Sequence, residues 1–263
     1  MQVFRFVRNV MATCAALLAI IVPAARATAQ TQSPTGVKTV LLIHGAWADG
    51  SSWSKVIPLL EAKGLRVVAV QIPLTSFADD VSATKRAIAL EDGPVLLVGH
   101  SYGGAVITEA GNDAKVAGLV FVSAVAPDTG ESAFGLITSV QTPIGTELRP
   151  DSSGYLKLTP KGIAEDFAQD LSAKEIEVLT ATQVPTSVAA MKGEVTTPAW
   201  KSKPSWYIVA ANDRAISPVL EAAQAKRIGA TTTTVPSSHV IMLAQPAKVA
   251  AVIFEAASKA SSK

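Results

Sequence analysis

The sequence predicts an α/β fold: about six mostly parallel strands flanked by helices, with a mostly helical insertion. Short apolar runs recur about every 30 residues, and segments typical of helices lie between them. Strands joined through helices form right-handed crossovers, which place them parallel in a sheet covered on both faces. The 263 residues are enough for one such domain, with apolar residues at 49% and charged residues at 17%.

Six segments rich in aliphatic or β-branched residues are predicted strands. They lie at residues 37–43, 66–72, 95–99, 119–125, 206–211 and 231–235. Five segments are predicted helices, at residues 53–62, 79–90, 103–110, 218–228 and 246–257. Gly64 ends the first of these helices, and Pro246 opens the last, where proline suits the first helical position.

The alternation of strands and helices stops between residues 128 and 203, where no strand is evident. Ser172 and Glu175 form a capping box, which predicts a helix start inside this segment. Ligands bind at the carboxyl edge of open parallel sheets, and an insertion at that edge would cover them. We therefore expect residues 128–203 to form a cap within an enzyme domain that spans residues 30–263.

The first 29 residues predict a signal peptide. Arg5 and Arg8 precede an apolar run at residues 10–22, and small residues follow Pro23. A run of 13 residues is too short for a bilayer core of about 30 Å, which takes about 20. We expect export to the periplasm or the medium, with no stable membrane insertion of the mature chain. The single cysteine, Cys14, lies in this leader, so a disulfide, a thiolate metal site and a cysteine nucleophile are excluded for the mature chain.

The charge balance excludes nucleic acid as an expected partner. Of the 23 Lys and Arg residues, three lie in the first 29 residues, and the remaining 20 face 21 acidic residues. The mature chain is therefore near neutral, and it has no basic stripe for phosphates or anionic lipid.

The strongest signal for chemistry is Gly-His-Ser-Tyr-Gly at residues 99–103, between a predicted strand and a predicted helix. A serine on such a sharp turn is an exposed nucleophile, and glycines at −2 and +2 allow the neighbouring elements to approach it closely. We predict Ser101 as the nucleophile. The sequence has three histidines, and His239 alone follows the last strand, so it is the expected general base.

A carboxylate should follow the serine and precede the histidine. Asp213 follows the strand at 206–211 and is the first choice; Asp128, after the strand at 119–125, is the alternative. The oxyanion needs preorganised donors. The backbone N–H of Tyr102 is one expected donor, and that of Ala46 is the other.

Residues 42–47 (Leu-Ile-His-Gly-Ala-Trp), residues 99–104 (Gly-His-Ser-Tyr-Gly-Gly), Asp213 and residues 238–239 (Ser-His) resemble the cofactor-free α/β-hydrolases that include plant methylesterases and hydroxynitrile lyases. The resemblance runs from about residue 37 to residue 257 and is weakest in the cap. It implies the α/β-hydrolase fold and the same assignments of nucleophile, base, acid and oxyanion donors. Lyases of this group carry lysine after the catalytic histidine. The residue here is Val240, which disfavours lyase chemistry.

The resulting hypothesis is a serine hydrolase that cleaves a carboxylic ester of a small molecule through an acyl-enzyme intermediate, with no metal or organic cofactor. Trp47 and Trp200 are candidate substrate-binding residues. The alternative is a small-molecule binding protein with little turnover, because fold alone does not determine function.

Overall fold

We describe a computed structural model that covers residues 36–260, so the predicted signal peptide at residues 1–29 lies outside the described residues. Its main sheet has six parallel strands in the order β2-β1-β3-β4-β8-β9. Their bounds are Thr39–Ile43 (β1), Arg66–Val70 (β2), Val95–His100 (β3), Val116–Val122 (β4), Ser205–Ala210 (β8) and Thr231–Val235 (β9). The prediction of about six mostly parallel strands is confirmed.

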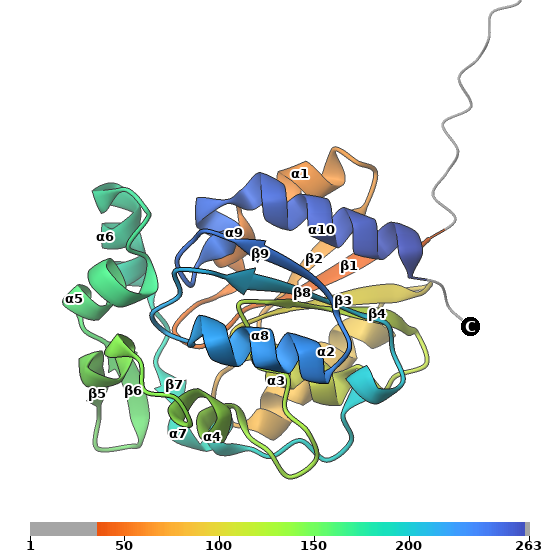
Figure 1. Ribbon diagram of the computed structural model, residues 1–263. Helices are drawn as coiled ribbons and strands as arrows, with labels where there is room; N and C mark the ends of the chain where they lie inside the picture. The colour runs from red at the N-terminus through yellow and green to blue at the C-terminus, as the bar shows by residue number, and fades with distance from the viewer. Residues whose placement is uncertain (1–35, 261–263) are drawn as a thin grey trace, which may run out of the picture. The chain divides into compact units, whose positions relative to one another are not determined.

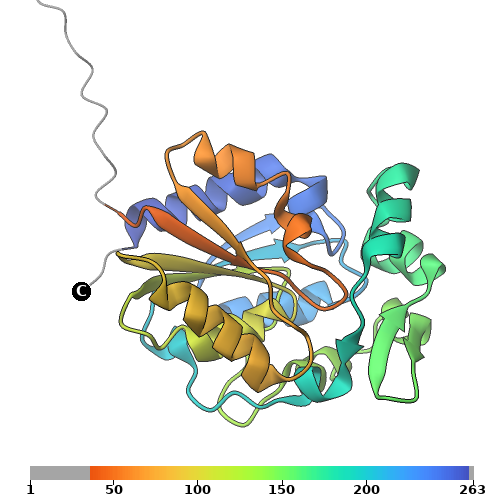
Figure 2. The same ribbon diagram turned by 180° about the vertical axis from the view of Figure 1, so that it is seen from behind.

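Helices cover both faces of this sheet (Figure 1). On one face lie α1 (Ile57–Glu61) and α10 (Pro246–Lys259); on the other lie α2 (Phe77–Ala89), α3 (Gly103–Ala110) and α8 (Pro218–Arg227). The reverse view shows the same two layers (Figure 2). Every residue of β3 and β4 is buried, as expected for central strands covered on both sides.

Most predicted elements match the observed bounds within two residues, and two differ by three or more. The segment predicted as one helix at residues 53–62 begins at the end of a 3-10 turn, η1 (Gly50–Trp53), and contains the separate short helix α1. A proline lies in the first turn of α1. β4 ends at Val122, before the predicted limit, because Ser123 has a φ of 43° and turns the chain out of the sheet.

The chain between β4 and β8 forms the insertion, and it lies beside the main sheet in Figure 1. Its helical elements are α4 (Ala133–Thr138), η2 (Pro143–Glu147), α5 (Pro160–Gly162), the π-turn η3 (Ile163–Phe167), α6 (Ala173–Thr182), α7 (Val188–Lys192) and η4 (Ala199–Lys201). The capping box of Ser172 and Glu175 starts α6, as predicted.

The insertion also contains a small antiparallel sheet that the sequence analysis did not predict. Its strands are β5 (Leu148–Pro150), β6 (Tyr155–Leu158) and β7 (Thr186–Ser187), in the order β5-β6-β7. Strands of two to four residues are too short to show the alternation that identifies a strand.

No helix of the described residues is long and apolar enough to cross a membrane.

We call residues 123–204, between β4 and β8, the cap segment, and its small sheet the cap sheet. The four strand ends that matter for the site are those of β1, β3, β8 and β9, which all point to the same edge of the parallel sheet. The loops after these strands therefore converge on one place, as in other open parallel sheets.

Candidate active site

Ser101 lies on a strained turn between β3 and α3. Its φ is 53°, in the left-handed region that non-glycine residues rarely adopt. A Cβ on Gly99 would lie 2.5 Å from the carbonyl oxygen of Gly103, and a Cβ on Gly103 would lie 2.7 Å from that of His44. Glycine is therefore required at both positions, and the turn holds the serine above the end of the sheet.

His239 and Asp213 come together from the loops after β9 and β8. His239 Nδ1 and Asp213 Oδ2 are 2.6 Å apart, and both side chains are buried. The other oxygen of Asp213 accepts the N–H groups of Ala215 and Ile216, at 2.7 and 2.9 Å. These bonds orient the carboxylate toward the imidazole. The alternative acid, Asp128, instead pairs with Lys201.

Glu221 on α8 lies behind this pair and is fully buried. One of its oxygens accepts the N–H of Ala210 at 3.0 Å, and its carboxyl group also contacts Asp213. Burial, and then the negative charge of Asp213, raise the pKa of Glu221 well above its usual range. The protonated form of Glu221 is therefore favoured beside Asp213.

His100, next to the serine, supports the histidine loop. Its Nε2 is 3.0 Å from the backbone oxygen of His239, so Nε2 carries the hydrogen and donates it. Burial holds the pKa of His100 well below its usual value, which keeps the ring neutral. The sequence analysis gave no role to His100. A bond across 139 positions has no local signal.

Ala46 and Tyr102 supply two buried backbone N–H groups beside the serine. Among residues 36–260, neither N–H donates a hydrogen bond to another protein group. Buried N–H groups are nearly always paired, so two unpaired donors beside Ser101 are available to bind a negatively charged oxygen. Gly45 makes this approach possible, because a Cβ there would lie 2.7 Å from the Cβ of Ser101.

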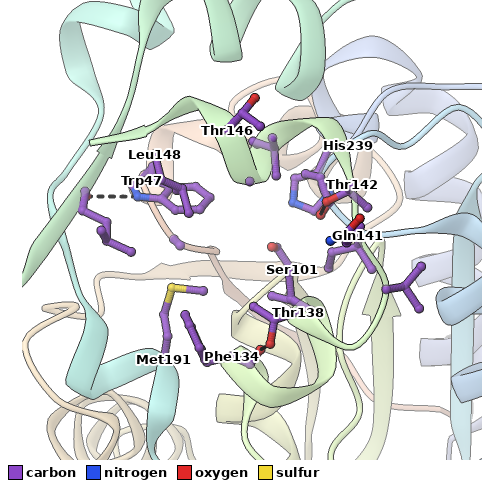
Figure 3. Close-up of a pocket in the computed structure, with 18 residues that line it drawn as sticks. Trp47, Ser101, Phe134, Thr138, Gln141, Thr142, Thr146, Leu148, Met191 and His239 are labelled. Carbon is purple, nitrogen blue, oxygen red and sulfur yellow. Dashed lines mark hydrogen bonds between the residues drawn. The ribbon is translucent and has the colours of Figure 1, made fainter. Parts of the chain in front are cut away.

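A cavity of about 360 Å³ opens above the serine. Ala46, Trp47, Ser101 and His239 line it, and the side chains of Ser101 and His239 point into it (Figure 3). No hydrogen bond joins Ser101 Oγ to His239 in the described part of the chain. Trp200 does not line this cavity; its indole donates to the backbone oxygen of Pro127 at 2.9 Å.

Most of the cavity wall comes from the cap segment. Its apolar members there are Phe134, Ile137, Val140, Ile144, Leu148, Leu156 and Met191. The cap segment also contributes the uncharged polar side chains of Thr138, Gln141, Thr142 and Thr146. No Lys, Arg, Asp or Glu is among the lining residues. We expected from the sequence that a cap would cover the site, but none of these lining residues was predicted.

The profile of the alpha/beta hydrolase family matches residues 40–252, which includes all the loops described above. The chain belongs to the alpha/beta hydrolase family. This agrees with the resemblance to α/β-hydrolases seen at residues 42–47 and 99–104.

Salicylic acid-binding protein 2 of Nicotiana tabacum is 27% identical to this alpha/beta hydrolase. The match covers 84% of this chain and 98% of that protein. Methylesterase 8 of Arabidopsis thaliana is 30% identical, over 67% of this chain and 73% of its own. A solved structure of a pyrethroid hydrolase from Sphingobium faniae JZ-2 has a TM-score of 0.75 at 23% identity, over 85% of this chain and 98% of that one. The structural likeness supports the fold, and the relatives support the methylesterase-like group within the family.

The described residues of this hydrolase contain no group of three or more His, Cys, Asp or Glu side chains arranged to hold a metal ion. The polar groups at the cavity are those of an acyl-transfer site: a serine, an imidazole with its carboxylate, and two backbone N–H groups.

Proposed function

We propose that this protein is a carboxylic ester hydrolase in which Ser101, His239 and Asp213 form a catalytic triad. The observation that carries the proposal is their placement at one cavity. The serine is on a strained turn, the imidazole is hydrogen-bonded to a buried carboxylate, and the N–H groups of Ala46 and Tyr102 are unpaired. The esterase relatives support the same reaction class.

In the proposed reaction, Ser101 Oγ attacks the ester carbonyl carbon while His239 Nε2 takes the serine proton. Asp213 holds Nδ1–H and stabilises the imidazolium, and the two N–H groups bind the oxyanion. Collapse of the tetrahedral intermediate breaks the bond to the alcohol, which leaves with the proton from Nε2. Water, activated by the same imidazole, then releases the acid and restores the serine.

The cavity supports an uncharged ester as the substrate class. Its wall is mainly apolar and has no carboxylate, ammonium or guanidinium group to pair with a charged substrate. Burying an unpaired charge is costly, so a charged acyl group would bind poorly there. The volume of about 360 Å³ lies within the range of small-molecule pockets.

The test is steady-state hydrolysis of p-nitrophenyl esters of increasing acyl length, with Ser101→Ala beside the wild type. We expect turnover that falls by several orders of magnitude in the variant. Mono-p-nitrophenyl glutarate, which carries a free carboxylate, should be cleaved far more slowly than the neutral valerate of similar length. A folded wild type that binds esters and turns none of them over would contradict the proposal and favour a binding protein.

We also propose that the chain is exported and that residues 1–29 are removed. The support is in the sequence: two arginines, an apolar run too short to span a bilayer, and small residues before position 30. Expression of the full chain in a Gram-negative host, followed by fractionation and N-terminal sequencing, tests this. Protein that stays in the cytoplasm with Met1 or Gln2 at its N-terminus would contradict export.

A further inference from the structure

Trp47, the residue after the oxyanion donor Ala46, has a strained backbone. Its φ is 59°, a conformation that costs about 1 kcal/mol or more for a residue with a bulky side chain. Such a conformation persists only where surrounding contacts hold it. The direction of the Ala46 N–H therefore depends on what holds the peptide units on either side of Ala46.

Two hydrogen bonds hold Trp47, and both come from the cap sheet. The backbone N–H of Trp47 donates to Thr186 Oγ1 at 2.9 Å, and its indole Nε1–H donates to the backbone oxygen of Leu156 at 3.1 Å. Thr186 is fully buried on β7. Its own hydroxyl hydrogen is directed to the oxygen of Val184, 3.5 Å away, which leaves a lone pair for the N–H of Trp47.

His44 holds the peptide unit on the other side of Ala46. Its Nε2 accepts the N–H of Ile72 at 3.2 Å, so Nδ1 carries the hydrogen and donates it to the oxygen of Gly45 at 3.0 Å. That oxygen belongs to the same planar peptide unit as the Ala46 N–H. His44 and Thr186 thus hold the two successive peptide planes that meet at the Cα of Ala46.

The second oxyanion donor is connected to the same short strand. The hydroxyl of Tyr102 donates to Asp80 Oδ2 at 2.6 Å, and the N–H of Leu74 donates to Asp80 Oδ1 at 2.7 Å. The oxygen of Leu74 accepts the N–H of Ser187 on β7 at 2.9 Å. Both proposed oxyanion donors are therefore connected through hydrogen bonds to the cap segment, one to Thr186 and the other to the adjacent Ser187.

We propose that Thr186 is a positioning residue for the oxyanion hole: its hydroxyl holds Trp47 and so directs the Ala46 N–H at the developing oxyanion. The inference rests on the proposed ester hydrolysis at Ser101. It gives the cap segment a part in transition-state stabilisation as well as in lining the cavity. Thr186 acts through Trp47 and does not itself line the cavity.

The test compares Thr186→Val, which keeps the shape and loses the hydroxyl, with Thr186→Ser, which keeps the hydroxyl. Complete loss of an oxyanion donor costs about 100- to 1000-fold in kcat, so a misdirected donor should cost about tenfold or more. We expect Thr186→Val to lower kcat by this factor with KM within about twofold, since the loss falls on the transition state. Thr186→Ser should restore most of the rate.

A second readout separates positioning from general loosening of the cap. A trifluoromethyl ketone binds as a tetrahedral oxyanion adduct, so its inhibition constant should rise in Thr186→Val by about the factor by which kcat/KM falls. Thr182→Val, on the exposed cap helix α6, is the matched control; within residues 36–260 the Thr182 hydroxyl bonds only the backbone oxygen of Val178. It should leave both quantities unchanged.

Three results would overturn the inference: an unchanged kcat in Thr186→Val, a loss confined to KM, or no recovery in Thr186→Ser. If Thr186→Val does not fold, Thr186→Ala replaces it, because alanine also lacks the hydroxyl and adds no atom. An inactive wild type would contradict the proposed function, whereas an active wild type with an equally active Thr186→Val would overturn only the positioning role.

Discussion

The edge of the parallel sheet and the cap segment face the same cavity but are built differently. At the sheet edge, the groups that would do the chemistry follow parallel strands of five or six residues and are set by close backbone contacts, such as that of Gly45 against Ser101. The cap segment consists of short helices and strands of two to four residues, and it supplies the apolar wall.

This difference predicts which region controls turnover and which controls the choice of substrate. Every substrate presents the same ester bond to the groups at the sheet edge, so changes there should lower turnover of all esters by a similar factor. Cap side chains contact the parts of the substrate that vary. Changes there should alter the ranking of substrates. Thr186 is the expected exception, because it acts on the proposed oxyanion hole through Trp47.

The largest expected effect is at the sheet edge. His239→Ala should lower kcat by about four orders of magnitude or more on every ester, because serine is then without a base. Asp213→Asn should also lose several orders of magnitude, since the histidine loses its orienting charge. Steady-state rates on acetate, butyrate and octanoate p-nitrophenyl esters measure this.

Asp128→Asn is the control for these two substitutions, because Asp128 pairs with Lys201 and not with His239. It should retain wild-type kcat within about twofold. A large loss in Asp128→Asn with near-normal rates in Asp213→Asn would reverse the assignment of the acid.

The next effect tests the close packing of the turn. Gly99→Ala should misplace the nucleophile turn or lower the free energy of unfolding by about 1–3 kcal/mol, because the new Cβ would lie 2.5 Å from the oxygen of Gly103. Urea unfolding and kcat, measured together, separate the two outcomes. Gly93→Ala, whose added Cβ meets no atom within 4 Å, should leave both near wild type. Equal stability and activity in the two variants would refute the packing argument.

A smaller effect is expected in the cap segment. Phe134→Ala should widen the cavity and raise kcat/KM for octanoate relative to butyrate by about tenfold, since one or two buried methylenes are worth about that much. The octanoate-to-butyrate ratio of kcat/KM is the measurement. Phe254→Ala, on α10 and away from the cavity, should leave the ratio unchanged. Equal losses on all esters in Phe134→Ala would remove the distinction between the regions.

The smallest effect concerns stability. Burial raises the pKa of Asp80 to about 6, although Tyr102 and Leu74 donate to it. Because the folded pKa exceeds the unfolded value, ionisation of Asp80 weakens the fold as pH rises from about 4 to about 6. The unfolding free energy of the wild type relative to Asp80→Asn should fall over this window and level off above it, as urea titrations at pH 4, 5, 6 and 7 can show.

Asp79→Asn is the control for Asp80, because hydrogen bonds from Ser76 and Thr75 lower the pKa of the exposed Asp79. Its ionisation favours the fold, and its effect on stability is lost only as pH falls below about 4. The relative stability of Asp79→Asn should therefore be flat between pH 5 and 7. A flat profile for Asp80→Asn as well would contradict the assignment.

The same division explains what could be predicted from the sequence. The parallel strands and the Ser101 turn could be predicted because their signals are local: apolar runs, and glycines at fixed offsets. Elimination among three histidines led to His239, and strand order led to Asp213; in the structure His239 lines the cavity and is hydrogen-bonded to Asp213.

The cap segment could not be read in this way, because its contacts link residues far apart in sequence. The bond from Trp47 to Thr186 spans 139 positions, and Trp200 packs outside the cavity against the oxygen of Pro127. β7 has only two residues, too few for any periodic pattern. The raised pKa of Glu221 likewise depends on burial that the sequence does not display.

The most direct test of Ser101 as the nucleophile is covalent labelling with diisopropyl fluorophosphate, followed by intact mass and peptide mapping. The account predicts one diisopropylphosphoryl adduct per chain, on Ser101. It should be absent from Ser101→Ala and form far more slowly on His239→Ala, with both variants folded. No adduct on the folded wild type, or an adduct on a different residue, would contradict the central claim.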